Sequence, residues 1–249
     1  MFIDDDMRVG EDFLSTYLSA EARWPESILV GKSLLPNDAR ATPFGRFREQ
    51  IEYVDPAARA PENLCAAGNM AIPSARFWLL NGFDGGIASG EDQDLSLRHA
   101  GLGGRSVFVP EARTVHHDSS VDVRSYCRRV QWGGEYIVPF CQKHPNWHEN
   151  SDRDRKNGYF HWKSDSLKDG ARKLGKRVLG LKPITEILFA VTAVLARHAP
   201  ASRALARAYS LLIGVHFFRG YRKGLERFGR VLPNQRPVEP TLGPDQASR

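Results

Sequence analysis

The chain has 249 residues, 41% of them hydrophobic, which is enough for one sizeable core plus an appendage or for two small domains and excludes a disordered chain. Three scattered cysteines exclude a disulfide framework and a CxxC metal site, and they fit a reducing compartment. The net charge of +6 would suit nucleic acid, anionic lipid or a phosphorylated substrate, and composition alone does not choose among them. The N-terminal MFIDDDMRVG does not resemble a secretory signal, so a cytoplasmic protein is expected.

The first half of the chain predicts strands that alternate with helices. Residues 1–3 are expected to end a buried strand, EDFLSTYL to form a helix, SILVGKSLL a strand, and residues 36–61 an irregular excursion. LCAAGNMAI then predicts a short strand, and Pro73 opens a helix that ends before Gly82. After the Gly-rich FDGGIASG come a capped helix, EDQDLSLRHAG, and two strands, RSVFVP and ARTVHH. This alternation predicts an α/β fold.

The second half is predicted to be helical and basic. A helix should extend to Phe140, followed by a charged linker at NSDRDRKNG and by basic amphipathic helices to about residue 230. We therefore expect three regions: an α/β part over residues 1–145, a basic helical part over residues 146–230, and a disordered tail over residues 231–249.

Two acidic clusters and a pair of histidines could carry chemistry. Asp4, Asp5 and Asp6 follow an apolar strand and offer the hard oxygen ligands that Mg²⁺ or Mn²⁺ prefers, although an acidic loop or a helix cap would look the same. GEDQD places acidic residues at a helix start, where carboxylates are also ordinary partners of the helix dipole. His116 and His117 end a strand and could complete a metal shell.

In this order, the motifs FIDDD, AAGNMAIPSARFWLLNGFD, GEDQDLSLRHAG and VFVPEARTVHH resemble family 2 glycosyltransferases over roughly residues 2–117. The resemblance implies the part of a GT-A α/β sandwich that begins at the aspartate motif, with a C-terminal helical appendage. It also implies an inverting transfer of a sugar from a nucleotide-diphospho-sugar to a hydroxyl of a glycan or lipid-linked acceptor, in cell-envelope glycan synthesis.

The resemblance also assigns roles to residues. Asp4 and Asp6 match the outer aspartates that hold a divalent metal (Mn²⁺ or Mg²⁺) and the donor diphosphate, with Asp5 between them, and His116 matches the metal-binding histidine. Asp92 matches the base that removes the acceptor proton, with Glu91 as its neighbour. Asn69 matches a strand that borders the sugar site.

Two departures from the family pattern affect the expected activity. The nucleotide-contacting segment that precedes the aspartate motif in the family is not in this sequence, so a misassigned start, a gene fragment and a separately supplied half are all open. A truncated, inactive, membrane-associated remnant is therefore the alternative function. The Q-x-x-R-W motif of processive synthases is not found, which favours a single, non-processive transfer.

The basic C-terminal helices have two interpretations. Ile184, Ile187, Leu188, Val191, Val194 and Leu195 recur at helical spacing after a run of Lys and Arg. The helices could pack on the core, or their apolar faces could enter an anionic membrane surface, which would place the protein on the inner face of the plasma membrane. Nucleic-acid binding is not expected, because the cations lie beside apolar faces rather than among stacking aromatics.

Overall fold

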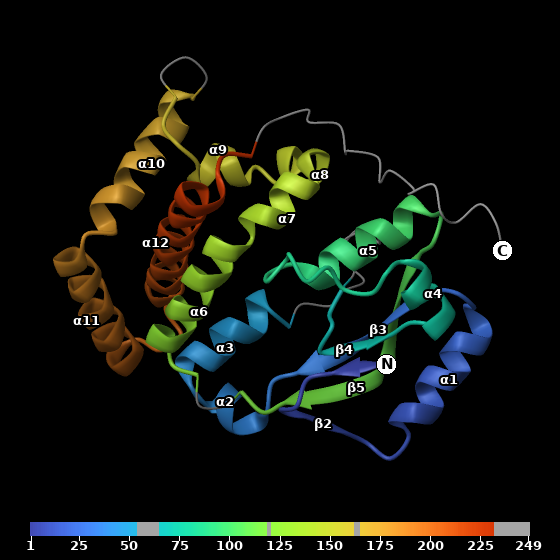
Figure 1. The fold of residues 1–249 in the computed structure, drawn as a ribbon. Helices are drawn as coiled ribbons and strands as arrows, with labels where there is room; N and C mark the ends of the chain where they lie inside the picture. The colour runs from blue at the N-terminus through green and yellow to red at the C-terminus, as the bar shows by residue number, and fades with distance from the viewer. Residues whose placement is uncertain (54–64, 119–120, 162–164, 232–249) are drawn as a thin grey trace.

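The structure, a computed structural model, describes residues 1–53, 65–118, 121–161 and 165–231. Its strands are β1 (Phe2–Ile3), β2 (Met7–Val9), β3 (Ile28–Leu34), β4 (Asn69–Ala71) and β5 (Ser106–His116). They form one mixed sheet in the order β1-β4-β3-β5-β2, shown in Figure 1. β3 and β5 run parallel, whereas the other neighbouring strands are antiparallel. The predicted first strand is present, but it is not buried, since Ile3 is 42% exposed.

Helices cover both faces of this sheet. Successive side chains of β3 point to opposite faces, and each face is packed against a different set of helices. Leu29 packs with Phe13 and Tyr17 of α1 (Phe13–Arg23). On the other face, Ile28 and Val30 pack with residues of α4 (Ser74–Leu79), α5 (Glu91–Gly101) and the loop between these helices. The predicted α/β architecture is confirmed.

The two strands expected between residues 105 and 117 are one continuous strand, β5. Val109 pairs with Gly31, but the next pair joins Arg113 to Lys32, so residues 110–112 bulge out of the ladder. Pro110 has no N–H to donate to a ladder, which explains why the pattern looked broken in the sequence.

The expectation of an irregular segment at residues 36–61 is wrong for its first part. This part contains α2 (Asn37–Ala41) and α3 (Pro43–Ile51), while residues 54–61 lie outside the described residues. The Thr42 hydroxyl accepts a 2.8 Å hydrogen bond from the Gly45 amide, and Pro43 is the first helical residue. This cap and proline are typical of a helix start.

The described residues beyond Val121 are mostly helical, as expected for this part of the chain. Their helices are α6 (Val123–Tyr136), α7 (Val138–Lys143), α8 (Pro145–Asn150), α9 (Arg153–Asn157), α10 (Leu167–Leu179), α11 (Lys182–His198) and α12 (Arg203–Phe228). The prediction of a linker at NSDRDRKNG is wrong, because this segment contains the end of α8 and all of α9. Of the predicted disordered tail, residues 232–249 lie outside the described residues.

The C-terminal helices share a core with the preceding part of the chain. Tyr221 and Leu225 of α12 pack among residues of α7, and Tyr209 packs against Phe44 and Tyr126. Helices from both sides of the expected boundary at residue 145 are thus joined, with α10 and α11 outermost (Figure 1). In the described part of the chain, no single helix meets the length and hydropathy criteria for crossing a bilayer, whereas α10 and α11 meet them only as a pair bent by 87°.

Candidate functional site

The aspartate loop links the two ends of the strand order. Asp4, Asp5 and Asp6 connect β1 with β2, and β2 pairs with β5 so that Met7 lies opposite His116. The backbone N–H of His117 donates a 2.7 Å hydrogen bond to the carbonyl oxygen of Asp6. This antiparallel pairing brings the loop to the end of β5.

Asp4, Asp6 and His116 offer ligand atoms that all lie within 4.8 Å of one another. His116 Nε2 lies 3.1 Å from Asp6 Oδ2, although 110 positions separate these residues in the chain. Two carboxylate oxygens and one imidazole nitrogen at this spacing fit a single divalent ion such as Mn²⁺ or Mg²⁺. The three predicted metal ligands therefore converge in the structure.

Tyr53 orients the imidazole of His116. Its hydroxyl lies 3.0 Å from His116 Nδ1, on the opposite side of the ring from Asp6. Burial raises the pKa of Tyr53 to about 12, so the phenol stays protonated at neutral pH. When Nδ1–H donates to the phenol oxygen, Nε2 keeps its lone pair toward the two aspartates, an arrangement typical of metal-binding histidines.

The second acidic cluster opens α5. The Asp92 carboxylate accepts hydrogen bonds from the backbone N–H of Gln93 at 2.7 Å and from that of Ala67 at 3.4 Å. Burial raises the pKa of Glu91, and the negative charges of Asp92 and Asp4 raise it further. The two acidic clusters thus lie close enough for their charges to interact.

Members of both clusters line one cavity of about 360 Å³. Asp4, His116, Glu91 and Asp92 contribute to its wall, and so do three cationic side chains, Lys32, Arg48 and Arg129. A cavity with carboxylates and cations in its wall can hold a metal ion and the negatively charged groups that the ion binds.

Two of the three cations in the cavity wall pair with the buried carboxylate of Asp118. Arg48 is only 2% exposed, and it contacts Asp118 at 2.7 Å and Glu52 at 2.8 Å. Arg129 contacts the same Asp118 carboxylate at 2.9 Å. Burial alone would raise the pKa of Asp118, but hydrogen bonds from Arg129 and Arg48 outweigh it and hold that pKa below its usual range.

Gly68 joins the aspartate loop to the strand that supports it. Its carbonyl oxygen accepts a 3.4 Å hydrogen bond from the Asp4 amide, and a Cβ atom at this position would lie 2.4 Å from Asp4 Oδ2. Ala67, the preceding residue, binds Asp92. The segment that leads into β4 therefore contacts both acidic clusters.

The two remaining predicted residues have different surroundings. Asn69 lines the cavity but is fully buried, with its side-chain amide bonded to Tyr17, Ala112 and Thr114. It therefore supports the sheet beneath the site. Asp5, like Asp6, is exposed and lies outside the described lining of the cavity, but it is not part of the ligand cluster.

Asp94 anchors the helix that carries Glu91 and Asp92. Its buried carboxylate lies 2.7 Å from Arg98, and 2.8 Å from both Lys143 and His144 of the α7 region. These partners hold its pKa well below the usual range, although burial alone would raise it. The buried ion pairs fix the start of α5 against α7.

Sequence reasoning missed Lys32, Arg48, Tyr53 and Asp118. Arg48 and Tyr53 belong to the segment interpreted as irregular, where the spacing of Phe44, Phe47 and Ile51 could have indicated a helix. Asp118 follows the two histidines directly, but no motif marked it. Comparisons of the chain with known protein families, with curated proteins and with solved structures found no match.

Proposed function

We propose that this protein is a metal-dependent, inverting, non-processive glycosyltransferase of family 2 type with a GT-A-like catalytic part. The observation that carries the proposal is the convergence of Asp4, Asp6 and His116 within 4.8 Å. Two of these residues, Asp4 and His116, line the cavity that Glu91 and Asp92 also line. These side chains come from three separate parts of the chain, which makes a chance acidic loop a poor explanation.

In the proposed reaction, Asp4, Asp6 and His116 hold a divalent ion, which when bound neutralises charge on the donor diphosphate. Asp92 accepts the proton of the acceptor hydroxyl as its oxygen bonds to the anomeric carbon. The bond from that carbon to the diphosphate breaks, and its electron pair leaves with the diphosphate. Lys32 and the half-exposed Arg129 favour this anionic leaving group, and a single displacement inverts the anomeric centre.

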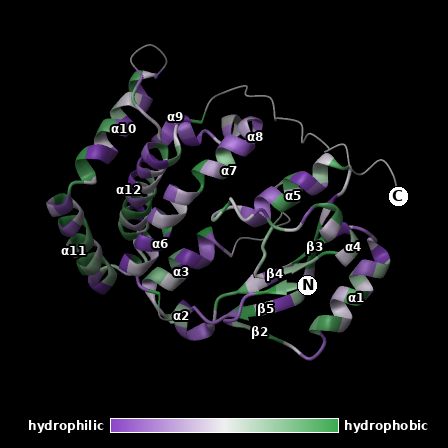
Figure 2. Ribbon diagram, in the orientation of Figure 1, coloured by the Kyte–Doolittle hydropathy of each residue, from purple (hydrophilic) through white to green (hydrophobic). Residues whose placement is uncertain are grey.

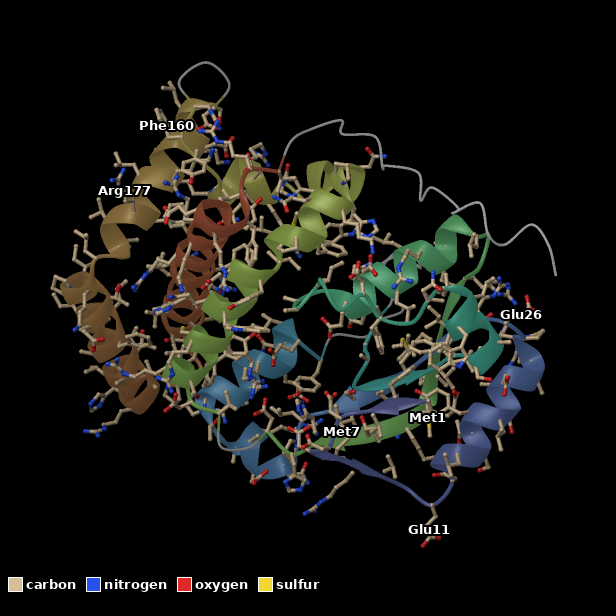
Figure 3. The ribbon with its side chains drawn as sticks, in the orientation of Figure 1. Met1, Met7, Glu11, Glu26, Phe160 and Arg177 are labelled. Atoms are coloured by element: carbon tan, nitrogen blue, oxygen red, sulfur yellow. The ribbon has the colours of Figure 1, made fainter. Side chains whose placement is uncertain are left out.

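The test is a transfer assay with a panel of nucleotide-sugars, Mn²⁺ and glycan or lipid-linked acceptors. Asp92→Asn should lower turnover by about 10²–10⁴-fold and leave donor binding nearly unchanged, because the base acts on the acceptor alone. Glu11→Gln is the matched control, since Glu11 is exposed and is not among the described lining residues of the cavity. It lies at the lower edge of the molecule in Figure 3. Equal losses of turnover and donor affinity in Asp92→Asn would refute the assignment of the base.

The alternative, an inactive membrane-associated remnant, has one structural observation in its favour. β1 lies at the end of the strand order, and apolar side chains near it are exposed, among them Met1, Leu14 and Leu18. An enzyme that lacked a covering element there would bind the metal but hold a nucleotide poorly. Mn²⁺ binding without any nucleotide-sugar binding would favour this alternative.

A further inference from the structure

The outer helices α10 and α11 expose apolar residues, and α10 also buries polar residues. α10 buries Asp169, Gly170 and Lys173, whereas Leu167 is 95% exposed and Leu174 is 64% exposed. Val178 and Leu181 continue this exposed stripe at helical spacing. A helix of a water-soluble surface normally shows the opposite arrangement.

α11 is apolar on two faces. It buries Phe189 against Leu212 of α12, with Thr185 and Thr192 on either side, and it exposes Ile187, Val191 and Val194. In Figure 2, hydrophobic residues recur along both outer helices. The residues at i, i+4 and i+7 form an apolar stripe that faces away from the protein core.

The inward polar groups are satisfied within the protein. Lys173 Nζ lies 2.8 Å from Asp165, and the two threonine hydroxyls donate hydrogen bonds to carbonyl oxygens one turn earlier. Their hydrogen bonds and the ion pair offset the cost of burying these groups. The inward face of each helix therefore has partners for its polar groups within the protein.

The same surface is strongly positive. Residues 167–198 contain seven Lys or Arg and two acidic residues, and both acids are ion-paired: Asp169 with Arg155 and Arg172, and Glu186 with Arg124. Lys168, Arg177 and Lys182 are exposed beside the apolar stripes. Two copies of this chain that met through this face would bring like charges together, whereas an anionic surface would complement it.

A groove of about 450 Å³ lies between α10, α12 and the segment around Phe160. Phe160, Leu174 and Phe218 form apolar walls, and Arg177 and Arg222 contribute cations. Figure 3 shows Phe160 and Arg177 beside α10, on the side of the molecule away from the sheet. Apolar walls next to cations fit a hydrocarbon chain that carries an anionic headgroup.

We propose that α10 and α11 form a docking surface for a bilayer that contains anionic phospholipid. The exposed apolar stripes enter the headgroup boundary, one acyl chain occupies the groove, and Arg177 and Lys182 meet lipid phosphates. The inference goes beyond the proposed transfer reaction and does not depend on it.

The test is flotation of the whole protein with phosphatidylcholine vesicles that either contain or lack phosphatidylglycerol. The wild type should float with the anionic vesicles and be released by salt. Leu174→Glu should weaken binding at least about tenfold, because it places a charge in the apolar stripe. Arg177→Gln should weaken binding about fivefold.

Leu18→Glu is the matched control, because Leu18 is 67% exposed on α1. It should bind the vesicles like the wild type, and both leucine variants should keep the wild-type thermal unfolding profile. Equal binding to neutral vesicles, or equal loss of binding in Leu18→Glu, would overturn the proposal. So would sedimentation that showed a lipid-free dimer disrupted by Leu174→Glu, since a second copy would then cover this face.

Discussion

At the scale of single residues, Gly68 determines where the Asp4 carboxylate can lie. A Cβ atom at Gly68 would lie 2.4 Å from Asp4 Oδ2, so any larger residue must displace that carboxylate. Changes to the groups that orient a metal ligand typically lower metal affinity by about 10- to 100-fold. We therefore expect Gly68→Ala to weaken Mn²⁺ binding by at least about tenfold in a calorimetric titration.

Gly85→Ala is the control for this substitution, because a Cβ atom at Gly85 would meet nothing within 4 Å. It should bind Mn²⁺ like the wild type. Unchanged affinity in Gly68→Ala would mean that Asp4 is not a ligand, or that its carboxylate moves away at no cost.

The sequence contained a strong signal for some residues of the site and none for others. Asp4, Asp6 and His116 stand directly at strand ends, where chain direction and residue type already indicate a ligand cluster. Arg48 and Tyr53 reach the cavity only because α3 packs beside it, and the local sequence does not encode that tertiary placement. Asp118 pairs with Arg48 and Arg129, which lie 70 and 11 positions away in the chain, and no local motif indicates these contacts.

At the scale of elements, glycines control how closely α6 and α12 approach each other. A Cβ atom at Gly220 would lie 1.9 Å from the carbonyl oxygen of Gln131, and one at Gly224 would lie 2.3 Å from that of Glu135. These contacts are with backbone, so the helices themselves would have to separate. We expect Gly220→Ala to lower the free energy of unfolding by about 1–3 kcal/mol or more, measured by urea denaturation.

A glycine on the same helix provides the comparison. Gly214 has open space around the position of a Cβ atom, so Gly214→Ala should raise the free energy of unfolding by about 0.5–1 kcal/mol through helix propensity. If both variants changed the free energy of unfolding equally, the close approach of α6 and α12 would not contribute to stability.

Element prediction succeeded where local signals were strong. The predicted helix EDQDLSLRHAG matches α5 at both ends, because acidic residues open it and glycine closes it. The sequence pattern predicts two strands at β5, because Pro110 interrupts the alternation of residues. The strand nevertheless continues on both sides of its bulge through its pairing with β3. The orientation of α11 could not be read either, since its apolar residues occur on more than one face and packing against α12 selects the buried one.

At the scale of the whole molecule, an α/β part carries the candidate site and a helical part carries the proposed membrane surface. The two parts are connected by a shared core, in which Tyr209 of α12 packs against Phe44 of α3, the helix that also carries Arg48. The proposed membrane surface and the cavity are therefore held by a continuous set of packed helices. This arrangement fits an enzyme that takes a lipid-linked acceptor from a bilayer.

In the proposed function, the cavity binds a nucleoside diphosphate through a divalent ion held by Asp4, Asp6 and His116. The most direct measurement is a calorimetric titration of UDP, GDP, CDP and TDP in the presence of Mn²⁺ or of EDTA. We predict that at least one of them binds only with Mn²⁺, that Asp6→Asn lowers its affinity at least about tenfold, and that Glu11→Gln leaves it unchanged. Equal binding in EDTA, or no loss of affinity in Asp6→Asn, would contradict the claim.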